Sequence, residues 1–540
     1  MTPGPWEVMP HENICRLVAA ACRTQPDLPA LILEDGITIT RRDFLATAQS
    51  FAGYLGERVR RGDRVAIMSG NRIEFMQAWL ATVANEAILV SINPSAGEAD
   101  AGHILADSRP AILITDDETS DSANRLAAAH QGVGQVVVLG DKEPDGLAQY
   151  CGKRVVDFSS LDIDPATPAN VYYTSGTTGL PKGCVLTHEW FMRVADVIMR
   201  LYPTTRKDRW LCPLPFYYGD PPWLLLLSLQ SGTPMVAMRR FSVSRFWPVV
   251  RRHAITRLFS IGAIPNLLLK AAAHPEERQH QVEFALQVGV PPGLQGDLID
   301  RFGFPWLEAY GLTETGAIIS MPRDATPERI AGGSIGIACP EVAVRIVDDL
   351  GTDVTDGTTG ELVVRAPAMM AAYWNRPDAT AEVMREGWIH TGDLVRQDAD
   401  GFFYFLGRKK DLIRRSGENV SAAEVEAVLR SHPQVLDAAV VPVADETRGE
   451  EIKAYVLPRD SAEVLSPDDL IDLCLRHLAR HKVPRYIEIR HCDFPRTPSM
   501  RIAKEKLRVG GVHTVSDAWD RELGLPRPRS GGPTLWSKSN

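Results

Sequence analysis

A stretch rich in glycine and hydroxyl groups, from Thr174 to Gly183, is the part of the sequence best suited to holding phosphate. A turn of this composition presents backbone amides and hydroxyl groups to phosphate oxygens, and Lys182 adds a positive charge. We predict a strand at 171–173 before it and a helix at 187–200 after it. The alternative, a surface turn without a ligand, accounts less well for three glycines and four hydroxyl side chains. The predicted phosphate contacts are Thr174, Ser175, Gly176, Thr177, Thr178, Gly179 and Lys182.

The spacing within this stretch differs from that of the phosphate loop of kinases and GTPases. That motif has four residues between its glycine and its lysine, and a serine or threonine follows the lysine. Here five residues separate Gly176 from Lys182, and Gly183 follows. A site of the P-loop type is therefore not expected.

The stretch closely resembles the signature of the adenylate-forming superfamily, which contains acyl- and aryl-CoA ligases, adenylation domains of peptide synthetases, and luciferases. Four more motifs resemble those of the superfamily and follow in the same order, and the resemblance covers residues 15–510. These motifs are Tyr310-Gly311-Leu312-Thr313-Glu314, Thr391-Gly392-Asp393, Gly407-Arg408-Lys409-Lys410-Asp411 and Gly417-Glu418-Asn419-Val420. The chain most resembles carnitine/crotonobetaine-type CoA ligases, in the stretches 387–393, 401–405, 416–421 and 482–490.

The resemblance implies an ATP-dependent acid:CoA ligase that works in two steps. A carboxylic acid attacks the α-phosphate of ATP, which gives acyl-AMP and pyrophosphate. A small C-terminal domain then rotates, and the thiol of coenzyme A displaces AMP. Lys410 matches the hinge of this rotation, and Gly417 lies in the motif that coenzyme A approaches.

The resemblance also implies a site for ATP and Mg²⁺. Glu314 supplies a hard oxygen ligand for magnesium, and Tyr310 stacks on adenine, with Gly311 and Thr313 in the same motif. Asp393 accepts hydrogen bonds from the ribose hydroxyls, and Arg408 donates to them. Ordinary structural roles remain open: Asp393 as a turn residue, Glu314 as a solvated acid at a helix start, and Arg408 as a surface charge.

The sequence departs from the superfamily near its C-terminal end. Members usually carry a Gly-Lys pair there, whose lysine contacts the carboxylate and the α-phosphate. This chain has Met500 and Arg501 in those positions, and Lys504 follows three residues later. Arginine keeps the positive charge but is larger and planar. We expect Arg501 to replace the lysine, with Lys504 as the rival and a slow first step as the third option.

A cluster of aromatic residues and one acid at 214–223 resembles the stretch that lines the acyl site. Tyr217, Tyr218 and Trp223 offer aromatic walls and Asp220 a negative charge, a set suited to an acid that carries a quaternary ammonium group. The plainer interpretation is a turn before a buried apolar helix. Gly289 lies near the superfamily's adenine stretch and can widen the pocket.

Composition and charge limit the classes of partner that the chain is expected to bind. Its net charge is −9 and it has no long basic run, which argues against nucleic acid and a membrane patch. No apolar run is long enough to span a bilayer, and no signal peptide is evident. The eight scattered cysteines include no Cys-x-x-Cys pair, as in reduced cytoplasmic proteins. The partners expected are a small carboxylic acid, ATP and coenzyme A, and a homodimer is left open.

The elements that position these motifs divide into two or more domains, because 540 residues exceed what one core supports. Amphipathic segments alternate with β-branched runs, which predicts an α/β N-terminal domain at 1–406 with a β-rich subdomain at about 335–406. A capping box at Ser421 and a Ser466-Pro467 pair predict two helix starts in a mobile α+β domain at 407–515. Residues 516–540, rich in Gly, Pro and Ser, predict a disordered tail.

Two other functions compete with the acid:CoA ligase. One is an adenylating enzyme that passes the acyl group to a carrier protein or an amine. The other is a nucleotide-binding protein with weak adenylation, because of Arg501.

Overall fold

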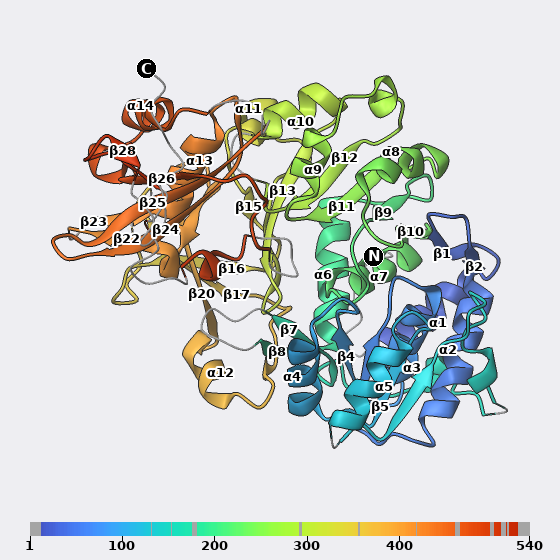
Figure 1. Cartoon of the computed structure of the whole chain (residues 1–540). Coiled ribbons are helices and arrows are strands. Elements are labelled where there is room, and N and C mark those ends of the chain that lie inside the picture. Colours follow the sequence, from blue (N-terminus) through green and yellow to red (C-terminus); the bar gives the residue numbers. More distant parts are fainter. Residues whose placement is uncertain are drawn as a thin grey trace.

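The computed structural model describes residues 12–130, 132–152, 154–174, 181–290, 294–354, 357–416, 418–459, 465–496, 502–508, 515 and 518–526. Within these residues four β-sheets are covered by helices, an α/β architecture (Figure 1). None of the described helices combines the length and apolar character that crossing a membrane requires. The helices are α1 Ile14–Thr24, α2 Arg41–Leu55, α3 Ile73–Val83, α4 Glu98–Ser108, α5 Ser120–Ala129, α6 His188–Leu201, α7 Asp220–Ser231, α8 Val243–Arg252, α9 Ile264–Lys270, α10 Leu294–Phe302, α11 Pro327–Ala331, α12 Pro377–Val383, α13 Ala422–Arg430, α14 Pro467–His477 and α15 Lys504–Arg508.

The first sheet, sheet A, has nine described strands in the order β15-β14-β13-β12-β11-β9-β10-β1-β2. The strands from β1 to β13 along this order pair in parallel, and β2, β14 and β15 are antiparallel edges. The strands are β1 Pro29–Leu33, β2 Thr38–Thr40, β9 Trp210–Cys212, β10 Met235–Ala237, β11 Arg257–Ile261, β12 Phe284–Val288, β13 Trp306–Leu312, β14 Gly316–Ser320 and β15 Ile337–Ala338.

Sheet B has seven described strands in the order β18-β8-β7-β4-β3-β5-β6. Its central parallel strands are almost wholly buried, as strands covered on both faces must be. The strands are β3 Arg64–Met68, β4 Ile88–Ile92, β5 Ile112–Thr115, β6 Gln135–Val138, β7 Pro168–Thr174, β8 Lys182–Thr187 and β18 Ala372–Tyr373.

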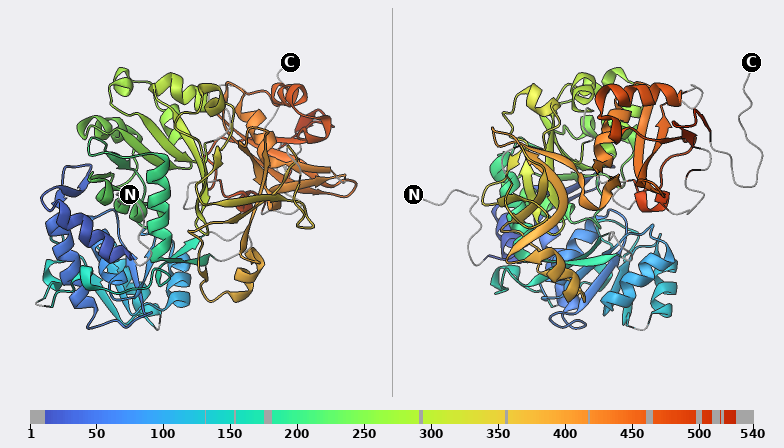
Figure 2. Two further views of the ribbon diagram at one scale, coloured as in Figure 1. Left: turned by 180° about the vertical axis from the view of Figure 1, so that it is seen from behind. Right: turned by 90° about the vertical axis from the view of Figure 1, so that its left-hand side faces the viewer.

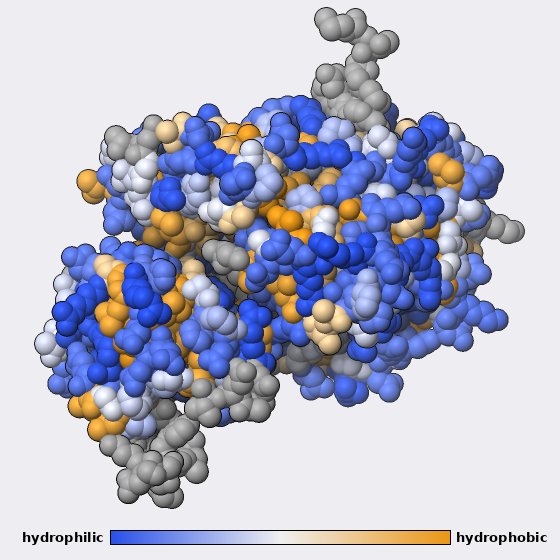
Figure 3. All heavy atoms as spheres, turned by 90° about the horizontal axis from the view of Figure 1, so that it is seen from above, coloured by the Kyte–Doolittle hydropathy of each residue, from blue (hydrophilic) through white to orange (hydrophobic). Residues whose placement is uncertain are grey.

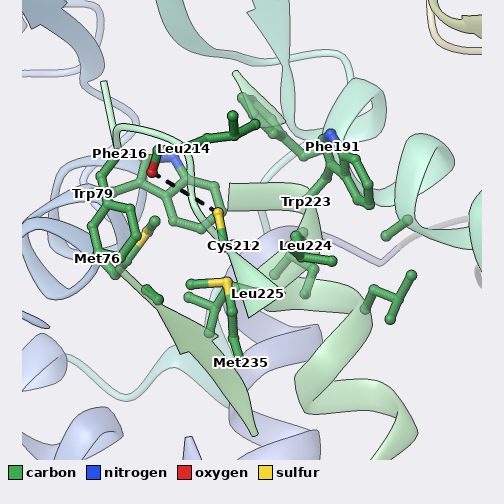
Figure 4. Packing of buried hydrophobic residues seen from close by; sticks show 14 of the residues in the cluster. Met76, Trp79, Phe191, Cys212, Leu214, Phe216, Trp223, Leu224, Leu225 and Met235 are labelled. Atoms are coloured by element: carbon green, nitrogen blue, oxygen red, sulfur yellow. Dashed lines mark hydrogen bonds between the residues drawn. The ribbon is translucent and has the colours of Figure 1, made fainter. Parts of the chain in front are cut away.

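Helices α1, α3, α6 and α7 pack against one another between sheets A and B. Figure 4 shows part of this core, where Met76 and Trp79 from α3 lie near Cys212 and Phe216. The rings of Trp79 and Phe191 are 5.5 Å apart. This apolar layer holds the ends of β7, β9 and β13 in fixed relation, and those ends carry the predicted motifs.

Sheet C is the β-rich part: five described strands, β16 Ala343–Val347, β17 Gly360–Arg365, β19 Met384–Arg385, β20 Trp388–Gln397 and β21 Phe403–Arg408. Sheet D contains β22 Leu412–Arg415, β23 Glu418–Ser421, β24 Val435–Asp445, β25 Gly449–Pro458, β26 Tyr486–Ile489, β27 Trp519–Asp520 and β28 Leu525–Pro526. Sheet D has its own buried apolar cluster, which includes Ile413, Val425 and Ile487. Figures 1 and 2 show it at one end of the molecule, away from the helices α1 to α3.

Two boundaries differ from the expectation from sequence. Strand β21 continues to Arg408, so sheet C includes the first residues that we assigned to the C-terminal domain. Residues 519–526 form β27 and β28 instead of a disordered tail, because buried Asp520 accepts hydrogen bonds from Arg485 on the neighbouring segment. The Gly- and Pro-rich composition that suggested the tail begins only at Pro526.

Seen from above, the surface is mostly hydrophilic and its hydrophobic side chains lie in scattered groups (Figure 3). A hollow separates a smaller lobe from the larger body in this view.

Candidate active site

A cavity of about 760 Å³ lies where sheets A, B and C meet. Residues from β7, β8, α7, β13 and β21 line it, although they are far apart in the sequence. Eleven of the residues predicted from sequence lie on its wall: Thr174, Lys182, Tyr217, Tyr218, Asp220, Tyr310, Gly311, Thr313, Glu314, Arg408 and Lys410.

Other predicted residues lie elsewhere. Gly289, Asp393 and Lys504 are described but are not among the residues that line the cavity. Ser175, Gly176, Thr177, Thr178, Gly179, Gly417 and Arg501 lie outside the described residues.

The ends of the phosphate stretch are two antiparallel strands, β7 and β8, with Thr174 opposite Lys182. The stretch therefore joins two strands, and Lys182 begins a strand where we expected a loop that runs directly into a helix. The predicted helix follows as α6, whose first turn is capped by Thr187, which accepts the N–H of Trp190.

Helix α4 contacts both ends of this hairpin. The hydroxyl of Tyr173 donates to Asp107 Oδ2 at 2.7 Å, and His103 Nε2 donates to the carbonyl of Pro181 at 3.1 Å. His103 and Asp107 are four residues apart, so they share one face of the helix. Sequence reasoning missed both residues, because only the fold places α4 beside the hairpin.

Glu314 lies in the turn between β13 and β14, opposite Lys182. The hydroxyl of Tyr373 donates to Glu314 Oε1 at 2.6 Å, and Lys182 Nζ lies 5.4 Å from the centre of the Tyr373 ring. Burial and the adjacent carboxylate hold the pKa of Tyr373 well above its usual range, so it remains a donor. Tyr373 is thus a shared wall between the lysine and the carboxylate, and no sequence motif indicated it.

Tyr310, Asp393 and Arg408 form one hydrogen-bonded group. Tyr310 donates its hydroxyl to Asp393 Oδ2 at 2.6 Å, and Arg408 Nε lies 3.1 Å from Asp393 Oδ1. Asp393 faces Arg408 across β20 and β21, and it is 1% exposed. Burial, with the Asp393 charge, raises the pKa of Tyr310. Asp393 therefore stands behind Tyr310 and Arg408, which line the cavity themselves.

The opposite end of the cavity is aromatic. Tyr217 and Tyr218 meet edge to face with ring centres 5.1 Å apart, and Trp223 meets Phe259 at 4.8 Å. Asp220, the first residue of α7, accepts the indole N–H of Trp223 at 3.2 Å. Burial raises the pKa of Asp220 to about 6. This end offers an apolar, aromatic enclosure with a single carboxyl group.

Gly289 follows Val288, which lines the cavity, and its φ is +83°. Its N–H donates to Glu308 Oε1 at 2.8 Å, and the N–H of Val290 donates to Glu308 Oε2 at 2.9 Å. Burial raises the pKa of Glu308 to about 8. The glycine thus lies in a backbone turn held by Glu308, and a Cβ at this position would meet no atom within 4 Å, so its role in widening the pocket stays a prediction.

Lys504 is occupied within the C-terminal part. Its Nζ lies 2.6 Å from Glu426 Oε1, and the same oxygen accepts the N–H of Val440. In this arrangement Lys504 is an internal ion-pair partner, away from the cavity.

Family comparisons agree with the geometry. Residues 18–374 match the family described as AMP-binding enzyme, and residues 424–501 match the AMP-binding enzyme C-terminal domain. A crotonobetaine/carnitine–CoA ligase from Salmonella enteritidis is 30% identical over 464 residues, which cover 83% of this chain and 89% of that ligase.

Solved structures share the fold over most of the chain. ATP-bound MatB from Rhodopseudomonas palustris superposes with a TM-score of 0.83 at 26% identity, covering 92% of this chain and 98% of MatB. The o-succinylbenzoate CoA synthetase MenE from Bacillus subtilis, in complex with its acyl-adenylate intermediate, gives a TM-score of 0.80 at 28% identity, with coverage of 92% and 98%. The chain belongs to the AMP-binding family of adenylate-forming enzymes.

Proposed function

We infer that the chain is an AMP-forming acid:CoA ligase, which activates a carboxylic acid as acyl-AMP and then forms the acyl-CoA thioester. The observation that carries this proposal is the single cavity that joins the ends of the phosphate hairpin, the Tyr310–Glu314 turn and the Arg408–Lys410 segment. Family membership and the relatives named above support it.

In the first step the cavity positions ATP against the acid. Hydroxyls and amides of the hairpin, with Lys182, bind the β- and γ-phosphates. Tyr310 stacks on adenine, and Arg408 donates to ribose, oriented by Asp393 behind it. The acid carboxylate then attacks the α-phosphate, a new P–O bond forms, and pyrophosphate leaves with the electrons of the broken P–O bond.

Magnesium fits this site, because one carboxylate together with phosphate oxygens is the ligand set that it commonly takes. Glu314 would hold it, and its charge would offset that of the phosphates. Tyr373 would orient the Glu314 carboxylate through its hydrogen bond to Oε1.

The second step needs the thiol of coenzyme A to reach the acyl carbon. We propose that residues 407–515 form the mobile domain and that Lys410 is its hinge, with Gly417–Val420 at the approach of coenzyme A. The thiolate attacks the acyl carbonyl, the C–S bond forms, the bond between the acyl carbon and the phosphate oxygen breaks, and AMP leaves with its electron pair.

A cation opposite the hairpin is required in the first step, and we propose Arg501. Lys504 is the weaker candidate because it pairs with Glu426. We expect Arg501→Ala to lower acid-dependent pyrophosphate exchange on the order of 100-fold, as for a lost transition-state contact, while thioester formation from supplied acyl-AMP changes little. Unchanged exchange in Arg501→Ala, with loss in Lys504→Ala, would reverse the assignment.

We also propose that the acid carries a cationic group, as crotonobetaine and carnitine do. Asp220 is half-buried and its carboxyl group lies in an aromatic enclosure, and no lysine or arginine pairs with it among the described residues. A trimethylammonium group would supply the missing positive charge and would face aromatic rings.

A single screen tests the activity and its competitors. ATP-dependent AMP release is measured across a panel of betaine-type, aliphatic and aromatic acids, with and without coenzyme A, and the products are identified. An acyl-CoA product supports the ligase. An acyl product on a carrier protein or an amine supports the first competitor, and nucleotide binding without turnover supports the second.

All eight cysteines are free thiols in the structure, and we place the reaction in the cytoplasm on that ground.

A further inference from the structure

Glu361 lies on β17 at the cavity wall, and its carboxylate contacts two segments with different roles. Oε1 accepts the backbone N–H of Gly392 at 3.1 Å. Oε2 accepts Lys409 Nζ at 3.2 Å. The largely buried side chain of Glu361 thus connects Gly392, which precedes Asp393, with Lys409, which precedes Lys410.

Strand β20 is irregular at Gly392, where Glu361 contacts it. The register of β17 against β20 shifts between Glu361 and Val363, and Gly392 has a φ of +68°. The N–H of Gly392 donates to the Glu361 side chain at this register shift, and a half-buried donor without an acceptor would be unfavourable. Glu361 supplies the acceptor and fixes the strand position next to Asp393.

The hinge side of the contact is an ion pair. Lys409 Nζ also lies 2.8 Å from Asp349 Oδ1, but the Asp349 side chain is 84% exposed against 11% for Glu361. Exposed pairs contribute little. Glu361 is therefore the partner that holds Lys409 against sheet C.

The arrangement held in this way keeps the proposed coenzyme A motif away from the cavity. Figure 1 shows the β22–β23 hairpin at the outer side of sheet D, far from β7 and β8. The described residues that line the cavity end at Lys410. Arg508 of α15 pairs with Asp411 at 2.8 Å, which adds a second contact to the hinge segment in the same arrangement.

We propose that Glu361 is a positioning residue that connects the ribose motif Thr391-Gly392-Asp393 with the hinge segment at Lys409 and Lys410. Through these contacts it stabilises the arrangement in which acyl-AMP forms. The proposal rests on the two-step function given above. Loss of the Glu361–Lys409 pair frees the hinge segment, so it slows the first half-reaction and spares the second.

The test compares Glu361→Gln, Lys409→Met and the double variant in separate half-reactions. Glutamine keeps one carbonyl oxygen for Gly392 and loses the charge that Lys409 requires. We expect each single variant to lower acid-dependent pyrophosphate exchange about fivefold, the scale of one half-buried ion pair, with thioester formation from supplied acyl-AMP unchanged or faster. The double variant should fall no further than either single one.

Glu361→Ala separates the two contacts, because it also removes the acceptor for Gly392. It should lower exchange as Glu361→Gln does and additionally raise KM for ATP severalfold. Glu283→Gln is the matched control, because it breaks the Glu283–Arg323 pair of 2.7 Å, together with a longer contact of 3.9 Å to Arg257, outside the cavity, and it should leave both half-reactions as in wild type.

Equal losses in both half-reactions, or a double variant whose loss is the product of the single losses, would overturn the proposal. A wild-type protein without acid-dependent exchange, or without thioester formation, would instead refute the proposed function before any variant is compared. Thermal unfolding of each variant reports whether it is folded, and Lys409→Met supplies the test if Glu361→Gln is not.

Discussion

At Asp220, burial and charge oppose each other. Its carboxyl group is buried in the aromatic end of the cavity, with Trp223 as its hydrogen-bond donor. Removing a carboxylate from water without a compensating charge is costly. A cationic acid in the cavity would reverse this cost, so the substrate and the ionisation of Asp220 should be coupled.

Asp220→Asn should therefore change how stability depends on pH. Because burial raises the pKa of Asp220 from 3.8 to about 6, its protonated form is favoured in the folded state. The stability that this contributes is complete below pH about 4 and is lost as the pH rises through about 6, up to about 3 kcal/mol. Denaturant unfolding from pH 4 to 8 should show this loss in wild type and not in Asp220→Asn. Parallel curves would contradict the burial argument.

The same residue predicts the pH dependence of substrate binding. KM for a betaine-type acid should fall as the pH rises through about 6, because the ionised carboxylate attracts the ammonium group. Asp220→Asn should raise that KM about tenfold and remove the pH dependence, as loss of one buried charge partner does. An uncharged acid of similar size is the control, since its KM should not rise in the variant.

Among the elements, the phosphate hairpin is held at both ends by α4. We expect Tyr173→Phe and His103→Ala each to raise KM for ATP about three- to tenfold, the effect of one lost hydrogen bond. The hairpin would remain but its ends would move. Tyr150→Phe is a matched control, because Tyr150 donates to the carbonyl of Val138 at 2.8 Å, away from the cavity. Steady-state kinetics with ATP varied would test this, and similar KM values in all three variants would contradict it.

At the same scale, the structure shows which elements the sequence can predict. The helix starts at Ser421 and Pro467 are confirmed, because their signals are local: Ser421 accepts the N–H of Glu424, and Pro467 is the first residue of α14. Strand β8 was missed, because its first residues, Lys182 and Gly183, belong to the phosphate motif and hide the apolar run that follows.

The residues of the candidate site likewise divide into those that the sequence can predict and those that it cannot. Residues within contiguous motifs, such as Glu314 and Arg408, could be predicted and lie on the cavity wall. Tyr373, Glu361 and Asp107 could not, because their roles come from contacts between segments that only the packed sheets bring together.

At the scale of the whole molecule, the cavity draws on residues from three sheets. Sheet B supplies Lys182, sheet A supplies Glu314 and sheet C supplies Arg408. A ligand that contacts all three sheets should therefore raise the free energy of unfolding more than a ligand that contacts fewer of them.

Thermal unfolding with ATP, AMP and EDTA tests this. A ligand specific to the folded state at 100 times its Kd adds about 2.7 kcal/mol, a rise in Tm of a few degrees for a chain of this size. EDTA should cut the rise with ATP far more than the rise with AMP, because the β- and γ-phosphates that we propose Glu314 and Lys182 to bind, with magnesium, are absent from AMP. Glu314→Gln should show a small rise with ATP that EDTA no longer changes. Equal effects of EDTA on ATP and AMP would place magnesium elsewhere, and Glu314 would then be a structural partner of Tyr373.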